Sequence, residues 1–352
     1  MSVSVVIPCL NEEGSIEEAV SRARSAFQSE PESEVVVVDN GSSDRSKELA
    51  EKAGARVVSE SRRGYGSAIM RGLQEARFNY VVISDADNTY DFHDGTKLVA
   101  ELKRGAEFAI GDRLNGEIEQ GAMPWLHRHI GTPVLTWVLN RFFGSRVQDI
   151  NCGLRAVKRD CVPRLRLRSP GMEFASEMVI HAQKAGLRFA EAKINYRKRR
   201  AGHAKLRTFR DGWRHLRFIL LCAPFPVFIF PSLFAVILGV LLSASDRMGF
   251  QMLGGSLYSV AFQLMTFGIL AKAVMWVNDS FIVDQRFGRI IRSFRLEYGI
   301  LASVILAFIG VLWVRDMSLP YLIRGGWVLA LAVQVFFSSF LLSIILMKRQ
   351  DG

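Results

Sequence analysis

The chain is 352 residues long, and both its net charge of +11 and its apolar residues are unevenly distributed. Four apolar stretches lie in the last 135 residues and leave too little polar sequence to cover them, which excludes an ordinary soluble protein. The four cysteines have no paired spacing, which excludes a cysteine-based metal or redox centre and suits a reducing compartment. A secretory signal is not expected, because the chain opens directly on a strand-like run.

Strand and helix patterns alternate in the first 90 residues. Buried strands are predicted at 3–7, 35–38, 56–58 and 80–84, with a helix over 12–27 and another that ends near 76. Such repeated strand–turn–helix units predict a parallel α/β sheet. Ligands bind beyond the carboxyl ends of the strands in such sheets. Asp39 and the pair Asp85 and Asp87 follow two of these ends, so we expect them to share one cleft.

The fourth strand is followed by the acidic turn SDADNTYD, residues 84–91, in a region without lysine or arginine between Phe78 and Lys97. Asp85 and Asp87, at positions i and i+2 after a strand end, can both point into one cleft if a divalent cation relieves their repulsion. Oxygen ligands favour Mg²⁺ or Mn²⁺, and Mg²⁺ often fills its remaining sites with substrate phosphates. A nucleotide-diphosphate ligand fits this pattern, but the turn alone leaves helix capping equally open, and Asp91 is interpreted as such a cap.

A basic segment precedes the apolar half. Between Lys184 and Arg217 there are twelve lysines and arginines against two acids. Such a cluster beside a membrane can bind lipid head groups or phosphates, or it can be a solvated face. We do not expect nucleic acid as a partner, because the segment has few aromatics for stacking. Residues 209–224 alternate cations and apolar residues at helical spacing, which predicts an amphipathic helix at the bilayer surface.

The apolar stretches predict about four membrane-spanning helices, at 225–243, 256–277, 299–314 and 327–347. The third is short for a span but carries no charge. The 278–298 connection has four arginines, and the C-terminal tail has Lys348 and Arg349, whereas the other two connections have fewer cations. The positive-inside rule then predicts a multi-pass protein with its N-terminal domain and C-terminus in the cytoplasm. A bacterial inner membrane is the membrane expected.

Several motifs carry a resemblance to a known family. The order SVVIPCLNEEGSI, VVVVDNGSSD, GYGSAIMRG and VVISDADNTYDF resembles the family 2 glycosyltransferases of the GT-A fold. With GDR at 111–113, DINCGLRA at 149–156, GMEF at 171–174 and RRAGHAKL at 199–206, residues 2–225 are similar to the polyprenyl-phosphate hexosyl synthases, which include dolichyl-phosphate mannose and glucose synthases. The resemblance implies an α/β, Rossmann-like GT-A domain at 1–208, whereas the interfacial helix at 209–224 and an all-α transmembrane domain at 225–352 are predicted from the residue patterns. The membrane half resembles these enzymes only in kind, since the number of spans differs among members.

The resemblance also implies roles for matching residues. Asp39 would contact the nucleotide, Asp85 would position the donor, and Asp87 would bind Mg²⁺ or Mn²⁺ with the diphosphate. Relatives often have a glutamine where this chain has Thr89, so a direct metal contact there stays open. The full nucleotide-sugar-binding set implied is Pro8, Asn11, Glu12, Asp39, Gly66, Asp85, Asp87 and Glu173.

The acceptor side is implied by basic residues. Arg113 matches an arginine that faces the acceptor phosphate, and Arg200 and Lys205 match a phosphate-clamping loop in which Ala204 replaces the usual serine. Arg197 and Arg199 are weaker candidates for phosphate binding, and a solvated surface fits both equally well. The catalytic set implied is Asp87, Arg113 and Lys205. A phosphate nucleophile needs no strong base; Glu173 and Glu177 are the candidates if one exists, although Glu177 also fits a polar helix surface.

The expected activity is inverting, metal-dependent transfer of a hexose from a nucleotide-diphosphate sugar, of UDP-glucose or GDP-mannose type, to the phosphate of a polyprenyl phosphate. Three alternatives remain. A processive polysaccharide synthase is disfavoured because the chain lacks a Q-x-x-R-W signature. Transfer to another lipid hydroxyl would require a general base. A non-enzymatic nucleotide-sugar-binding scaffold conflicts with the retained Asp39, Asp85 and Asp87.

Overall fold

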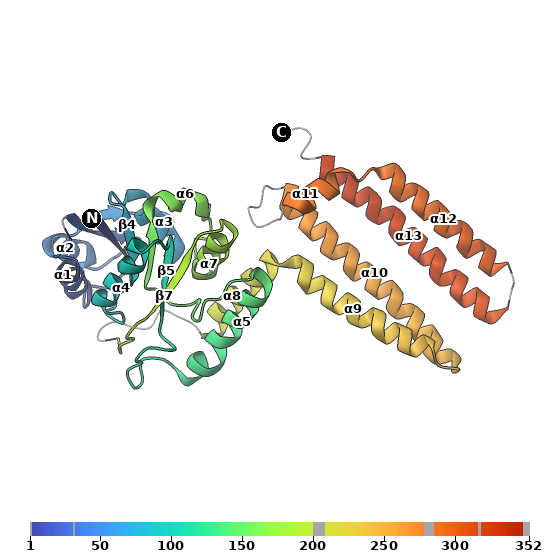
Figure 1. Ribbon diagram of the computed structural model, residues 1–352, viewed down its shortest axis with the longest axis horizontal. Coiled ribbons are helices and arrows are strands. Elements are labelled where there is room, and N and C mark those ends of the chain that lie inside the picture. The colour runs from blue at the N-terminus through green and yellow to red at the C-terminus, as the bar shows by residue number, and fades with distance from the viewer. Residues whose placement is uncertain (1, 31, 200–207, 278–284, 316–317, 348–352) are drawn as a thin grey trace. The chain divides into compact units, whose positions relative to one another are not determined.

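The computed structural model describes residues 2–30, 32–199, 208–277, 285–315 and 318–347, and it separates into two compact units. The first unit, Met1–Ile219, is built around a β-sheet, and the second, Leu220–Gly352, is helical. Figure 1 colours both units along the chain. Each unit is described by itself below.

A seven-stranded sheet forms the centre of the first unit. Its strands are β1 (Ser2–Cys9), β2 (Glu32–Asp39), β3 (Arg56–Ser59), β4 (Tyr80–Ile83), β5 (Phe108–Asp112), β6 (Arg155–Lys158) and β7 (Phe189–Lys193), in the order β3-β2-β1-β4-β6-β5-β7. The neighbours β1–β2, β1–β4, β2–β3 and β5–β7 are parallel, whereas β6 runs antiparallel to both β4 and β5. The predicted α/β, mainly parallel class is confirmed, and β5, β6 and β7 are strands beyond the four that the sequence patterns predicted.

Helices cover both faces of this sheet. The helical segments between Ile16 and Cys222 are α1 (Ile16–Ala26), α2 (Ser46–Lys52), α3 (Tyr65–Glu75), α4 (Phe92–Lys103), the π-helix η1 (His127–Gly131), α5 (Thr132–Phe143), the 3₁₀ turn η2 (Arg159–Cys161), α6 (Val162–Leu165), α7 (Phe174–Lys184) and α8 (Thr208–Cys222). Gly72 of α3 lies against Val6, and Gly95 of α4 lies against Val82. Val82 pairs with Val5, so Val6 and Val82 point to opposite faces. These two helices therefore pack on opposite sides of the sheet.

The first helix begins later than the sequence pattern predicts. It starts at Ile16 rather than Glu12, because residues 11–15 form a turn tied to the loop after β2. The backbone N–H of Asn11 donates to the Ser42 hydroxyl at 3.0 Å, and that of Glu12 donates to the Ser46 hydroxyl at 2.8 Å. These contacts hold the turn in a non-helical shape, with Asn11 at a φ of 51°.

The second unit contains α9 (Pro224–Ser243), α10 (Met248–Val277), α11 (Gln285–Arg292), α12 (Leu296–Val314) and α13 (Leu319–Met347). In the described part of the chain, α9, α10, α12 and α13 are long and apolar enough to cross a membrane. Glycines allow close approach within each helical pair: a Cβ on Gly254 of α10 would lie 2.7 Å from the Gly239 carbonyl of α9, and one on Gly325 of α13 would lie 2.8 Å from the Gly310 carbonyl of α12. The four predicted apolar stretches lie inside these helices.

Candidate active site

The candidate site lies at the edge of the sheet where β1, β2 and β4 end. These strands are adjacent and parallel, so the loops that follow Cys9, Asp39 and Ile83 leave from the same edge. Backbone hydrogen bonds hold the loops together, from Asn40 N–H to the Cys9 carbonyl at 2.9 Å and from Ser84 N–H to the Val6 carbonyl at 3.1 Å. The structure thus brings three residues of the predicted site to the same edge of the sheet: Pro8, Asp39 and Asp85.

The turns after β1 and β2 form one hydrogen-bonded unit. Asp39 is 9% exposed, and its Oδ1 accepts from Ser42 N–H at 3.1 Å. The Asn11 side-chain oxygen accepts from Ser43 N–H at 2.8 Å. Asn11 and Asp39 are therefore fixed on either side of the same pair of turns, next to Pro8, which pairs with Val38 in the sheet.

Asp85 is a half-buried carboxylate beside a second acid. The Tyr65 hydroxyl donates to its Oδ1 at 2.9 Å. Burial first, and then the negative charge of Asp87, raises the pKa of Asp85 to about 7, although the Tyr65 hydrogen bond and the charges of Arg199 and Arg113 oppose this shift. The pair is thus held close enough for mutual repulsion, which a cation placed between the carboxylates relieves.

Asp87 has a different partner on each of its oxygens. Oδ1 accepts from the Thr89 backbone N–H at 3.0 Å and from the Thr89 hydroxyl at 2.6 Å. Oδ2 accepts from Arg199 Nη2 at 2.6 Å. Thr89 therefore orients the carboxylate, and its own hydroxyl proton is directed at Asp87.

The donor set fits a divalent cation that arrives with a diphosphate. Among the described residues, no group of three histidine, cysteine or acidic side chains could by itself hold a metal ion. Mg²⁺ is commonly held by one or two carboxylates and substrate phosphates rather than by an all-protein cage. Asp85 and Asp87 supply two carboxylates, and a cation would relieve the repulsion between their negative charges.

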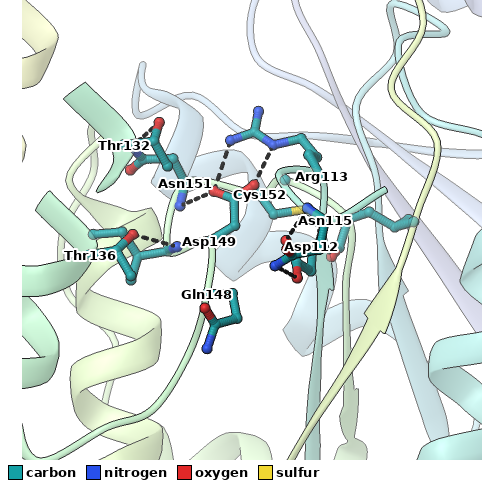
Figure 2. Close-up of polar contacts among 12 residues, drawn as sticks. Asp112, Arg113, Asn115, Thr132, Thr136, Gln148, Asp149, Asn151 and Cys152 are labelled. Atoms are coloured by element: carbon teal, nitrogen blue, oxygen red, sulfur yellow. Dashed lines mark hydrogen bonds and ion pairs between the residues drawn. The ribbon is translucent and has the colours of Figure 1, made fainter. Parts of the chain in front are cut away.

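Arg113 forms a buried ion pair directly after β5. Its Nε and Nη2 donate to the two Asp149 oxygens at 2.6 and 3.0 Å, in the forked geometry that Figure 2 shows. Nη1 donates to the Tyr90 hydroxyl at 3.5 Å, and the guanidinium lies 5.0 Å from the centre of the Tyr196 ring. Sequence reasoning selected Arg113 but not Asp149, although Asp149 opens the quoted DINCGLRA motif.

The loop 149–153 connects this ion pair to α5 (Figure 2). Asp149 Oδ1 accepts from Asn151 N–H at 3.1 Å, and the Asn151 amide donates to the Thr132 hydroxyl at 3.3 Å. Ile150 N–H donates to the Thr136 hydroxyl at 3.4 Å. Two threonines on one face of α5 therefore hold the loop that orients Arg113.

Gly66, Glu173 and Glu177 all contact the turn at 168–171. A Cβ on Gly66 would lie 2.1 Å from the Ser169 carbonyl, so α3 packs closely on this turn. The Glu173 carboxylate accepts from Gly171 N–H at 3.3 Å. The interpretation of Glu177 as a polar helix surface is wrong, because it is 3% exposed and its carboxylate accepts from the Arg168 and Ser169 N–H groups at 3.0 and 2.9 Å.

Within the basic segment, the residues just before 200 contact the acidic turn. Arg197 N–H donates to the Thr89 carbonyl at 2.8 Å, and the Arg197 guanidinium pairs with Asp91. Asp91 also caps α4 by accepting from His93 N–H at 3.1 Å, which confirms its interpretation as a helix cap. Arg200 and Lys205, two of the predicted phosphate-binding residues, lie outside the described residues.

Comparisons with known proteins identify the family. The family model described as "Glycosyl transferase family 2" matches residues 4–164. The "Low-salt glycan biosynthesis hexosyltransferase Agl6" of Haloferax volcanii is 36% identical, over 97% of this chain and 88% of its own length. The chain belongs to glycosyl transferase family 2. It is therefore a glycosyltransferase, as the sequence motifs predicted.

Other relatives of this glycosyltransferase have lipid phosphates in their names. The "Dolichyl-phosphate hexose transferase" of Haloferax volcanii is 33% identical over 51% of this chain and 76% of its own length. The "Dolichol-phosphate mannosyltransferase" of Pyrococcus furiosus is 29% identical over 61% of this chain and 63% of its own length. The crystal structure of glucosyl-3-phosphoglycerate synthase from Mycobacterium tuberculosis with phosphoglyceric acid has a TM-score of 0.50 at 25% identity, covering 62% of this chain and 79% of that one. This likeness supports the GT-A fold.

The glycosyltransferase domain also has an apolar surface that the sequence analysis missed. Five large apolar side chains are exposed there: Trp125, Leu126, Ile130, Val134 and Trp137. The two tryptophans are 67% and 65% exposed. They lie on η1, on α5 and on the turn before them. Between Glu119 and Asp149 the chain has three arginines, two histidines and no acid. The signal was present as a long stretch without acids, but a helix of mixed polarity inside a globular domain is normally read as core.

Proposed function

We propose that this glycosyltransferase transfers a hexose from a nucleotide-diphosphate sugar to the phosphate of a polyprenyl phosphate, with inversion at the anomeric carbon. One observation carries the proposal: the half-buried Asp85 and the buried Asp87 lie at the strand edge with Asp39, and Arg199 of the basic segment contacts Asp87. That combination suits a metal-bound diphosphate. The four apolar helices of the same chain and the names of the dolichyl-phosphate relatives support a lipid acceptor.

The donor would be held from its two ends. Asp39, with the turn containing Pro8, Asn11 and Glu12, binds the nucleoside, and Asp85 positions the sugar. Asp87 is the residue that holds Mg²⁺ or Mn²⁺. When bound, that ion supplies positive charge that stabilises the leaving diphosphate. Arg200 and Lys205 are proposed to bind the remaining phosphate oxygens.

The acceptor phosphate would be bound near Arg113. It is already an anion near neutral pH, so its oxygen attacks the anomeric carbon directly while the bond from that carbon to the diphosphate oxygen breaks. The electron pair of the broken bond leaves with the nucleotide diphosphate. No proton has to be removed from the nucleophile, which suits Glu173 and Glu177 as residues that hold the 168–171 turn rather than as bases.

The exposed apolar surface of η1 and α5 is proposed to lie on the membrane that contains the acceptor. Exposed tryptophans together with arginines and no acids are typical of interfacial helices on anionic lipid. Thr132 and Thr136 then connect the lipid-facing helix to the loop that orients Arg113. By the distribution of lysine and arginine in the loops, this face of the bilayer is the cytoplasmic one.

A fluorescent label can test the membrane contact of α5. Val134→Cys, labelled in the full-length protein in vesicles, should be quenched strongly by brominated lipids, because the residue is 50% exposed on the apolar surface. The matched control is Glu48→Cys on α2, an exposed position among charged residues, and it should be quenched little. Equal quenching at the two positions would contradict the membrane contact.

The transfer reaction itself is tested with membranes that contain the protein, polyprenyl phosphate and a panel of radiolabelled nucleotide sugars. Labelled lipid phosphate sugar should form from one donor, and EDTA should abolish it. Label found in neutral glycolipid or in polymer would show that the acceptor is not a lipid phosphate. Formation of the product in excess EDTA would exclude the metal role of Asp87.

A further inference from the structure

Residues 195–199 form a strap across the acidic turn. Tyr196 pairs with Tyr90 as an antiparallel bridge and with Ile118 as a parallel one. Backbone N–H groups of the strap donate to the Glu117 carbonyl from Tyr196 and to the Thr89 carbonyl from Arg197, both at 2.8 Å. The strap is thus fixed to the loops on both of its sides.

The register of this pairing determines which residue lies over Asp87. In an antiparallel pair, each step forward on one segment is a step back on the other. Because residue 196 pairs with 90, residue 199 comes opposite 87. Arg199 Nη2 lies 2.6 Å from Asp87 Oδ2, and its Nη1 lies 3.6 Å from Glu12 Oε1. One guanidinium therefore spans two carboxylates whose side chains are 9% and 8% exposed.

Arg199 contacts the Asp87 oxygen that Thr89 leaves available. Oδ1 already accepts two hydrogen bonds from Thr89, whereas Oδ2 accepts from Arg199. A divalent cation bound through Oδ2 and the guanidinium cannot occupy the same position. Their charges would also repel each other at this distance.

We propose that Arg199 is a displaceable counter-ion that holds Asp87 until the metal arrives with the nucleotide diphosphate. The proposal rests on the metal-dependent function proposed above and goes further, because it makes metal binding depend on the nucleotide. Metal alone must break the ion pair of Arg199 with Asp87 and brings no anion to replace it, so it binds weakly. With the diphosphate present, the displaced guanidinium, still tethered by the strap, gains phosphate oxygens as new partners. Donor and metal therefore bind as one complex.

Manganese titration of the full-length protein in detergent tests this, with free Mn²⁺ measured by electron paramagnetic resonance. Arg199→Gln should bind Mn²⁺ alone about tenfold more tightly than the wild type or better, because a charge-assisted competitor is removed. The tightening of Mn²⁺ binding that UDP causes should be smaller in the variant. Lys198→Gln, which removes the same charge from an exposed neighbour in the strap, should change Mn²⁺ affinity less than twofold.

Unchanged or weaker binding of Mn²⁺ alone by Arg199→Gln would overturn the proposal, since Arg199 would then only stabilise the strap. Arg199→Lys keeps the positive charge but loses the guanidinium that contacts both Asp87 and Glu12, so its Mn²⁺ affinity should be intermediate. This variant replaces Arg199→Gln in the titration if the glutamine variant does not fold. The titration reports on Asp87 without any transfer reaction. If transfer resists EDTA while the titrations come out as expected, the proposed metal role in catalysis is refuted. Competition between Mn²⁺ and Arg199 for Asp87 would still be established.

Discussion

Replacing Asp87 with asparagine is expected to lower hexose transfer by at least about a hundredfold. Under the proposed function, the change removes the negative charge that would hold the cation, and with it the charge stabilisation of the leaving diphosphate. The asparagine oxygen can still accept from Thr89, so the turn keeps its hydrogen bonds. The measurement is the rate of labelled lipid formation at saturating donor, together with Mn²⁺ binding in the presence of UDP.

Asp91→Asn is the matched control for this experiment. It makes the same chemical change four residues along the same loop, and asparagine is as good a helix N-cap as aspartate. Its ion pairs with Arg22 and Arg197 are partly exposed and contribute little. Transfer should stay within a few-fold of the wild type. An Asp87→Asn variant that is as active as this control would remove Asp87 from the mechanism.

Replacing Arg155 with methionine is expected to destabilise the first unit by about 3–5 kcal/mol. Arg155 is 2% exposed and donates to three backbone carbonyls, those of Cys152, Ala175 and Ile150, at 2.7–2.8 Å. Burial lowers its pKa, while nearby tyrosine, cysteine and Asp149 groups oppose that shift. Methionine fills the space but leaves all three carbonyls without these donors.

The loss can be followed with a thiol-reactive dye, because the four cysteines are all buried and become reactive on unfolding. The melting temperature should fall by roughly 6–20 °C. Arg159→Met, an exposed arginine just beyond the same strand, is the matched control and should shift it by no more than about 2 °C. A similarly small shift for Arg155→Met would mean that the three contacts are replaced by water at little cost.

The first four strands were predictable because each is a short apolar run ended by a turn residue. The sequence also showed which acids belong together, since Asp39 and Asp85 each follow such a run. Asp91 was assigned correctly as a cap because its position relative to the next helix is local information. These features depend on neighbours within a few residues, which patterns report well.

Features that depend on distant contacts were not predictable. The strands β5, β6 and β7 were not predicted, and the antiparallel direction of β6 is set by its pairing with β4 and β5, which lie far from it in the chain. Glu177 has the polarity of a surface residue, and only the backbone N–H groups of Arg168 and Ser169 explain its burial. The ion pair of Arg113 with Asp149 joins residues 36 apart, so no local spacing indicates it.

The antiparallel strand β6 brings a second part of the chain to the edge of the sheet that carries the candidate site. Parallel strands deliver only the loops that follow them to the active edge, but a reversed strand delivers the loop that precedes it. The chain therefore leaves this edge at Arg113 and returns to it at Asp149, with η1 and α5 in between. Because both ends of this excursion are anchored in the sheet, its length and surface can change without shifting any strand register. Under the proposed function, this excursion is the acceptor side of the site, so a change of acceptor requires changes only there and leaves β1, β2 and β4 in place.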